Sequence, residues 1–189
     1  METAVKLQKF FDDKLANIDP TPTEFQDQKA AMWIAGNINQ VVQFDDFPDL
    51  HWGATYLPKT GDHVVSNCGS WTLGISKDCK DPDAAYVALE FMTNSESTRF
   101  YGEVGGYPPA RKSAYENNTQ WDEYPYSLAK EQLFEAAVPR PKTPVYTVLT
   151  SKFAEAMLDI FTGSDAKESL DAVASYVDDE YARVKDSIK

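Results

Sequence analysis

The stretch SNCGSWTLGISKDCKDPDAA, residues 66–85, changes character twice within a short span. Small residues surround Trp71, and apolar and small side chains then alternate over 72–76, which predicts a strand. Asp81 followed by Pro82 predicts the start of a helix, because the aspartate side chain can cap it and proline suits its first position. A strand that leads directly into a helix is typical of an α/β fold.

Working outward from this stretch, the rest of the chain alternates further single strands with helices. Apolar spacing and turn residues predict strands at 29–36, within 47–59 and at 72–76, and helices at 5–15, 37–44, 81–92, 95–101, within 115–137, at 145–161 and at 165–184. Ser95 is expected to cap its helix, and the glycines and prolines of 105–114 predict a rigid loop. Residues 138–144 are expected to form an extended connector.

Composition limits the kinds of partner. The chain has 189 residues, 42% of them hydrophobic, and a net charge of −12. A hydrophobic fraction of this size supports a folded core. The acidic balance argues against nucleic acid and against an anionic membrane surface, since both require clustered lysine and arginine.

No signal peptide is visible, and no apolar run approaches the roughly 18 residues that span a membrane. Cys68 and Cys79 flank the predicted strand, too far apart to form a disulfide bond.

Catalytic and metal-binding patterns are weak. His51 and His63 stand in no metal-ligand spacing, and no phosphate-binding loop or nucleophile elbow is present. Asp78, Asp81 and Asp83 resemble calcium-loop spacing only faintly, and helix capping explains them better. A pair of carboxylates of the glycosidase type stays open. We therefore expect neither catalysis nor a cofactor.

Aromatic residues offer the more specific hint, since they make up 13% of the chain. Tryptophan and tyrosine rings stack on the flat C–H faces of sugars. Trp71 follows Gly69 and Ser70, whose small size allows a ligand to approach the backbone. Composition leaves Trp71 open as either a sugar platform or a core residue.

The other aromatic residues are assigned by context. We expect Trp33 to lie in the core and Trp52 to pack internally. Trp121, in a polar stretch, is expected to be a surface anchor or a cleft residue. Tyr107 and Tyr146 are expected to face a groove.

Five segments in order resemble one protein family. They are KAAMWIAGN (29–37), WGATYLPK (52–59), SNCGSWTLGISKDCKDPDAA (66–85), GGYPPARKSA (105–114) and PRPKTPVY (139–146). Together they are similar to the C-terminal half of the extracellular solute-binding proteins of bacterial ABC sugar importers, the maltose-binding-protein-like family. The resemblance implies a two-lobed α/β fold that closes on an oligosaccharide and then docks on a membrane permease. It also implies no catalysis and an extracytoplasmic location, in the periplasm or as a lipoprotein on the outer face of the membrane.

The resemblance further implies a set of sugar contacts. These residues are Gly36, Asn37, Asn67, Gly69, Ser70, Trp71 and Tyr146, with Tyr107 and Pro108 as weaker candidates. Two positions depart from the family pattern. Ile38 stands near a position where many members have a tryptophan, so one stacking platform is absent. Cys68 replaces a common glycine and narrows the approach.

Family members run to about twice this length, so the resemblance predicts a fragment. Residues 1–70 would then belong to the second lobe, 71–107 to a segment that packs on the largely missing first lobe, and 108–189 to second-lobe and hinge-side helices. The uncovered face would favour self-association. Two alternatives stay open: a glycoside-processing enzyme domain, and an interaction fragment with no ligand site.

Overall fold

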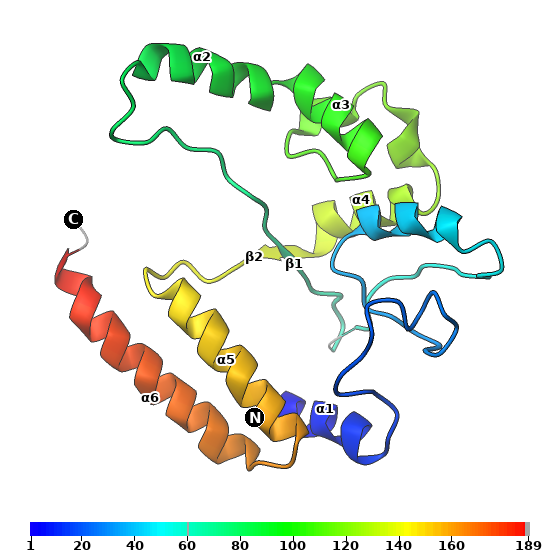
Figure 1. Ribbon diagram of the computed structural model, residues 1–189, viewed down its shortest axis with the longest axis vertical. Helices are drawn as coiled ribbons and strands as arrows, with labels where there is room; N and C mark the ends of the chain where they lie inside the picture. The colour runs from blue at the N-terminus through cyan, green and yellow to red at the C-terminus, as the bar shows by residue number, and fades with distance from the viewer. Residues whose placement is uncertain (60, 188–189) are drawn as a thin grey trace. The chain divides into compact units, whose positions relative to one another are not determined.

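The computed structural model describes residues 1–59 and 61–187 and divides into two compact units (Figure 1). Unit 1 combines residues 1–22 with 141–189, and unit 2 comprises residues 23–140. Most regular structure is helical, with one small parallel sheet. This composition is compatible with the expected α/β class. No helix in the described ranges is long and apolar enough to cross a membrane.

Unit 1 is built from three helices that pack on one another. They are α1 (Glu2–Asp12), α5 (Tyr146–Phe161) and α6 (Ala166–Val184), and a short 3-10 helix, η4 (Lys185–Ser187), follows α6. The core centres on Ile160, which is fully buried beside Ala4 and Ala166. The Phe11 ring stacks on the Phe161 ring at 4.3 Å, and both contacts join α1 to the end of α5.

The turn between α5 and α6 follows the sequence signals closely. Gly163 has a φ of +112°, a conformation that other residues rarely adopt, so α5 ends at Phe161. The Asp165 side chain then accepts hydrogen bonds from the backbone N–H groups of Lys167 and Glu168, both at 2.9 Å. The predicted helices at 145–161 and 165–184 are therefore confirmed, and so is the helix predicted at 5–15, although both its ends lie three residues earlier in the structure.

Unit 2 contains the remaining elements. They are η1 (Ile38–Asp46), β1 (Ser66–Cys68), α2 (Pro82–Thr93), α3 (Ser95–Gly105), η2 (Lys112–Tyr115), η3 (Thr119–Asp122), α4 (Tyr126–Ala136) and β2 (Ala137–Pro139). The short helix predicted at 37–44 is present as the 3-10 helix η1. The expected start of α2 is confirmed, since the Asp81 side chain accepts a hydrogen bond from the backbone N–H of Ala84.

The predicted cap of the next helix was wrong by one residue. Asn94, not Ser95, is the N-cap of α3, and its side-chain oxygen accepts a hydrogen bond from Ser97 N at 2.8 Å. Ser95 is already the first helical residue. The helix also continues to Gly105 rather than stopping near Tyr101, because Gly106 provides the left-handed residue (φ +67°) that ends it.

The three predicted strands were wrong. Residues 29–36, 47–59 and 72–76 form no strand in the structure. Met32 and Ile34 are 86% and 77% exposed, so 29–36 is not a buried strand either. The observed sheet instead pairs Ser66–Cys68 in parallel with Ala137–Pro139. It ends there because Pro139 has no N–H to donate and Pro141 follows closely, so the chain beyond Cys68 has no partner strand on that side.

Trp121 lies in the core of unit 2, and the prediction of a surface anchor or cleft residue was wrong. The side chain is fully buried. Its ring meets the Tyr115 and Tyr126 rings edge to face, with centroids 5.5 and 5.4 Å apart. The polar residues around it in the sequence belong to the turns of η3, and among these side chains it is the indole that points inward. Spacing alone could not show this, because η3 is too short to have an apolar periodicity.

Candidate functional site

Trp71 is the most exposed of the large hydrophobic residues in the described ranges. Its side chain is 98% exposed, so the reading of Trp71 as a core residue is excluded. Gly69 and Ser70 before it are also exposed. An indole in water presents both faces of its ring to a ligand, and small neighbours leave the approach clear.

The polar residues beside Trp71 are placed by the β1–β2 pair. Asn67 is the middle residue of β1 opposite Val138, and it is exposed. Just beyond the strand, a Cβ at Gly69 would lie 3.3 Å from the Arg140 Nε. Asn67, Gly69, Ser70 and Trp71 therefore form one exposed segment with Arg140 at its edge. We refer to Asn67–Trp71 as the crossing segment.

The turn at Gly36 and Asn37 begins η1. The Gln40 side-chain oxygen accepts hydrogen bonds from the backbone N–H groups of both residues, at 2.9 Å from Gly36 N and 3.4 Å from Asn37 N. These two N–H groups are thus already engaged within the chain. What the turn offers a ligand is the half-buried Asn37 side chain rather than its backbone donors.

The loop that carries Tyr107 packs against η1. A Cβ at Gly106 would lie 3.3 Å from the Asn39 Cα and from the Val42 Cγ2, so only glycine fits this approach. The Tyr107 ring stacks on the Tyr101 ring with centroids 5.3 Å apart and planes 15° apart. The stacking presents a pair of parallel rings next to η1.

The expected site residues therefore fall into three groups. Gly36, Asn37 and Tyr107 come together through the contact between η1 and Gly106. The crossing segment is held by β2 and Arg140. Tyr146 is the first residue of α5 and belongs to unit 1, where it is half-buried.

The sequence reasoning missed two aromatic groups in unit 2. Tyr101 was not singled out, although its spacing of six residues from Tyr107 across three glycines is the signal that could have found the stack. A second group surrounds the buried Phe44 ring, whose neighbours include Trp33 at 6.2 Å and Trp52 at 4.8 Å. The predicted internal packing of Trp52 is confirmed, whereas Trp33 packs against the group while remaining 38% exposed.

A buried tyrosine, Tyr115, anchors the loop that follows Tyr107 and Pro108 through the next residue, Pro109. The Tyr115 hydroxyl donates a hydrogen bond of 3.1 Å to the carbonyl oxygen of Pro109. Close packing on the other side reinforces the loop, since a Cβ at Gly102 would lie 2.9 Å from the Tyr107 carbonyl oxygen. Burial raises the pKa of Tyr115 to about 12, from an ordinary value of 10.0, so the hydroxyl keeps its proton and remains a donor.

Replacing Tyr115 with phenylalanine should lower the free energy of unfolding by about 1 kcal/mol below pH 10, through the lost hydrogen bond. A raised pKa in the folded state means that the neutral hydroxyl contributes stability up to pH 10, and that this contribution is lost as pH rises toward 12. This loss of stability at high pH should be smaller than the roughly 2.7 kcal/mol that a pKa shift of two units represents, because solvent screens a partly accessible group.

The wild type should therefore lose more stability between pH 10 and 12 than Tyr115→Phe does. Urea unfolding followed by tryptophan fluorescence on both sides of pH 10 measures this difference. Tyr86→Phe, on the exposed face of α2, is the matched control and should follow the wild type. A constant gap between Tyr115→Phe and the wild type at all pH values would contradict the assignment.

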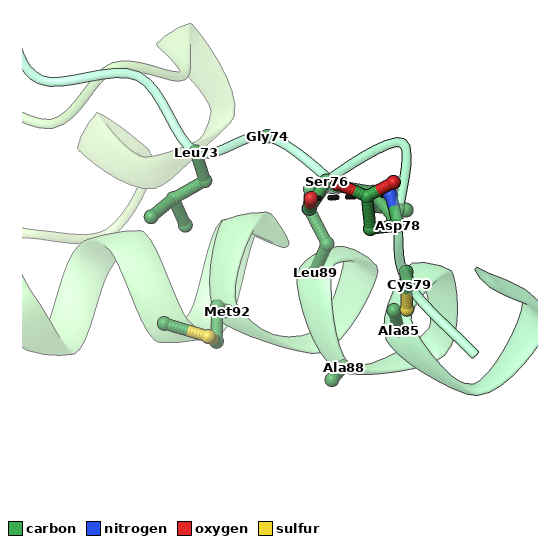
Figure 2. A pocket seen from close by; sticks show the side chains of 10 residues that line it. Leu73, Gly74, Ser76, Asp78, Cys79, Ala85, Ala88, Leu89 and Met92 are labelled. Carbon is green, nitrogen blue, oxygen red and sulfur yellow. Dashed lines mark hydrogen bonds between the residues drawn. The ribbon is translucent and has the colours of Figure 1, made fainter. Parts of the chain in front are cut away.

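A shallow apolar groove lies beside the crossing segment. The segment Leu73–Cys79 runs along α2 and encloses a groove of about 430 Å³ (Figure 2). Leu73 points from the segment toward the helix, and the floor is made of Ala85, Ala88, Leu89 and Met92. Within this segment, the Asp78 N donates a hydrogen bond of 3.3 Å to the Ser76 Oγ (Figure 2). The groove suits an apolar side chain better than a polyhydroxylated ligand.

Other chemistry has little support. No cluster of three histidine, cysteine, aspartate or glutamate residues suited to a metal occurs in the part of the chain that the structure describes. Cys68 and Cys79 are free thiols. A hydrogen bond from Lys6 and its positive charge lower the pKa of Glu2, and hydrogen bonds from Thr23 and Lys29 lower that of Asp27. A general acid at neutral pH requires the opposite direction.

Exposed aromatic rings beside small and amide-bearing residues, on a helical scaffold with a parallel strand pair, are compatible with a protein that binds a ligand. Comparison with known families agrees, since the family model for bacterial extracellular solute-binding proteins matches residues 2–129. The chain belongs to this family. Its role is therefore to bind a substrate for transport, the family is in general non-enzymatic, and its full-length members work outside the cytoplasm.

Proposed function

We propose that the solute is a sugar or oligosaccharide and that the chain serves an ABC importer as its sugar-binding component. The observation that carries this proposal is the 98% exposure of the Trp71 indole. Leaving a ring of this size in water forgoes roughly 150–250 Å² of burial, which a stacked sugar face would recover. Asn67 and Ser70 lie within four residues of it and supply polar groups for hydroxyls.

A second subsite is proposed at η1. The Asn37 side chain offers an amide, and the stacked Tyr101 and Tyr107 rings offer a second flat surface, with Gly36 leaving room at the turn. Tyr146 at the start of α5 is proposed as a further contact. The same proposal includes docking on importer permeases and a location in the periplasm or anchored to the membrane. It also includes the packing of residues 71–107 on another lobe of the full-length protein. The apolar surface of α2, which has no buried residue, supports the last of these.

The test is a titration of intrinsic tryptophan fluorescence with a panel of oligosaccharides. A saturable change is expected for at least one sugar. Trp71→Ala should weaken binding by about two- to tenfold, because an aromatic contact contributes about 0.5–1.5 kcal/mol and 1.4 kcal/mol corresponds to a factor of ten. Calorimetry measures the affinity of the variant, whose fluorescence no longer reports this ring.

Tyr181→Ala, on α6 of unit 1, is the matched control and should leave the affinity unchanged. It removes an exposed aromatic ring of similar size. Equal weakening by both variants would point to a general loss of stability instead of a stacking contact. The absence of a response to any sugar would overturn the proposal that the solute is a carbohydrate.

A further inference from the structure

Arg140 follows directly after β2, at the edge of the sheet where β1 also ends. The two strands are parallel, and their last residues, Cys68 and Pro139, are paired (Figure 1). Gly69 and Arg140 are therefore the first residues beyond the same edge. In open α/β sheets, ligands bind beyond the carboxyl ends of the parallel strands. Arg140 thus stands at a position where a side chain can meet a ligand.

The Arg140 side chain lies against the backbone of the crossing segment. A Cβ at Gly69 would lie 3.3 Å from the Arg140 Nε, 3.4 Å from its Cζ and 3.7 Å from its Cδ. Two atoms of the guanidinium group therefore lie close to this one glycine, and a larger residue at position 69 would crowd them. Glycine lets the guanidinium lie close to the chain between Asn67 and Trp71.

Charge singles out Arg140 within the two segments that meet at this edge. Residues 64–76 and 136–141 contain one charged residue, Arg140, and no aspartate or glutamate. The whole chain has a net charge of −12, so its overall field repels anions. At this edge, however, the nearest charge along both segments is positive. A neutral sugar gains little from that charge, whereas an anionic sugar gains a charge-assisted hydrogen bond.

The geometry of a guanidinium group favours a carboxylate as the anion. Its five N–H donors form a planar fork that matches the two oxygens of a carboxylate. Arg140 takes part in an interaction within the chain, and a fork of five donors can serve that neighbour and a ligand together. One guanidinium also balances the single charge of a carboxylate, whereas a phosphate group carries a charge of about −1.5 to −2.

We propose that the solute is an acidic sugar of the uronic acid class and that Arg140 binds its carboxylate. This inference rests on the proposed sugar binding and deepens it by naming the substrate class. The observation that carries it is the guanidinium of Arg140 against Gly69, at the carboxyl ends of the paired strands. Arg140 is then the residue that selects acidic over neutral sugars.

Spacing along the chain allows the carboxylate contact and the stacking contact within one short oligosaccharide. The guanidinium lies beside Gly69, and Trp71 is two residues further on. Two residues of chain span at most about 7 Å. A carboxylate held by Arg140 and a ring stacked on Trp71 therefore belong to the same sugar unit or to adjoining units.

Calorimetry of the full chain tests this selection with matched ligands. The ligands are trimers of glucuronic, galacturonic and mannuronic acid, together with the methyl ester of each, which keeps the sugar rings and removes the charge. At least one acid should bind about 10- to 100-fold more tightly than its ester, the factor expected for a hydrogen bond between charged groups. The preference should decrease at high salt, because ions screen an exposed charge pair.

Variants of Arg140 test its role in the same assay. Arg140→Gln should bring the ratio of the acid and ester affinities close to one. Arg140→Lys keeps the charge but loses the planar fork, so its ratio should lie between those of Arg140→Gln and the wild type. Arg183→Gln is the matched control, because it removes the same charge from an exposed residue of α6, and it should keep the wild-type ratio.

The outcomes separate this inference from the proposed function. No response to any sugar, acidic or neutral, would overturn both. Binding of neutral sugars without preference for an acid would overturn the acidic class alone, and so would a preference that Arg140→Gln retains while overall affinity falls. Tighter binding of sugar phosphates than of uronic acids would overturn the choice of a carboxylate.

Discussion

Replacing Trp121 with alanine is expected to lower the free energy of unfolding of unit 2 by about 3–5 kcal/mol. The indole is fully buried and contacts two tyrosine rings edge to face, Tyr115 and Tyr126. Removing it leaves a cavity that the two rigid tyrosine rings cannot close. Tyr115 also meets the Phe134 ring at 5.3 Å, so the loss reaches α4 as well.

The conservative variant separates ring packing from hydrogen bonding. The Trp121 Nε1 is buried without a hydrogen-bond partner in the described part of the chain. An unsatisfied buried donor is unfavourable by about 1–3 kcal/mol. Trp121→Phe removes this donor and keeps most of the ring, so its loss of stability should be well below that of the alanine variant. Equal losses in the two variants would contradict a core role based on ring packing.

Tryptophan fluorescence is suited to this measurement because of where the tryptophans lie. All four, Trp33, Trp52, Trp71 and Trp121, belong to unit 2. Urea unfolding followed by their emission therefore reports unit 2, while far-ultraviolet circular dichroism reports the helices of both units. Trp71→Phe in the same background removes the exposed emitter and should leave the unfolding midpoint unchanged.

The helices of this chain could be predicted from the sequence because their signals are local. Asp81 caps α2 and Asp165 caps α6 through hydrogen bonds that span two or three residues. Gly163 ends α5 by its own backbone conformation. Each of these interactions is complete within one short segment, so the pattern in the sequence determines the outcome.

The strands could not be predicted in the same way. The alternation over 72–76 is suited to a strand, but a strand exists only when a second segment supplies hydrogen bonds. The available partner is β2, and it pairs with Ser66–Cys68 and ends at Pro139. Nothing in residues 72–76 records where the neighbouring strand stops, because that information lies about seventy residues further along the chain.

In the candidate site, too, local features could be predicted from the sequence, whereas features that depend on distant packing could not. The sequence pointed to Trp71 and Tyr107 as ligand contacts, but the exposure of one ring and the stacking of the other on Tyr101 depend on distant packing. Trp121 was misjudged for the same reason. Its polar sequence neighbours gave no indication that Tyr115 and Tyr126 would enclose it.

Replacing Ile160 with alanine should destabilise unit 1 by about 2–5 kcal/mol. Ile160 is fully buried between α1 and α6, and Met157, Phe161 and Leu170 pack around the same core. Its carbonyl oxygen also accepts a hydrogen bond of 2.7 Å from the Gln8 Nε2, which joins α1 to α5. The substitution leaves this backbone contact in place, so the measured loss isolates the side chain.

Ile160→Val is the matched control and should lower the free energy of unfolding by only about 0.5–1.5 kcal/mol. Far-ultraviolet circular dichroism during urea unfolding measures both variants, since unit 1 contains three long helices and no tryptophan. Among the described residues of unit 1, Ile160 is the one large side chain that is fully buried, so its truncation should have a large effect on this small core. An alanine variant as stable as the valine variant would show that α1, α5 and α6 are held together by their other contacts, such as the Phe11–Phe161 stack, and not by Ile160.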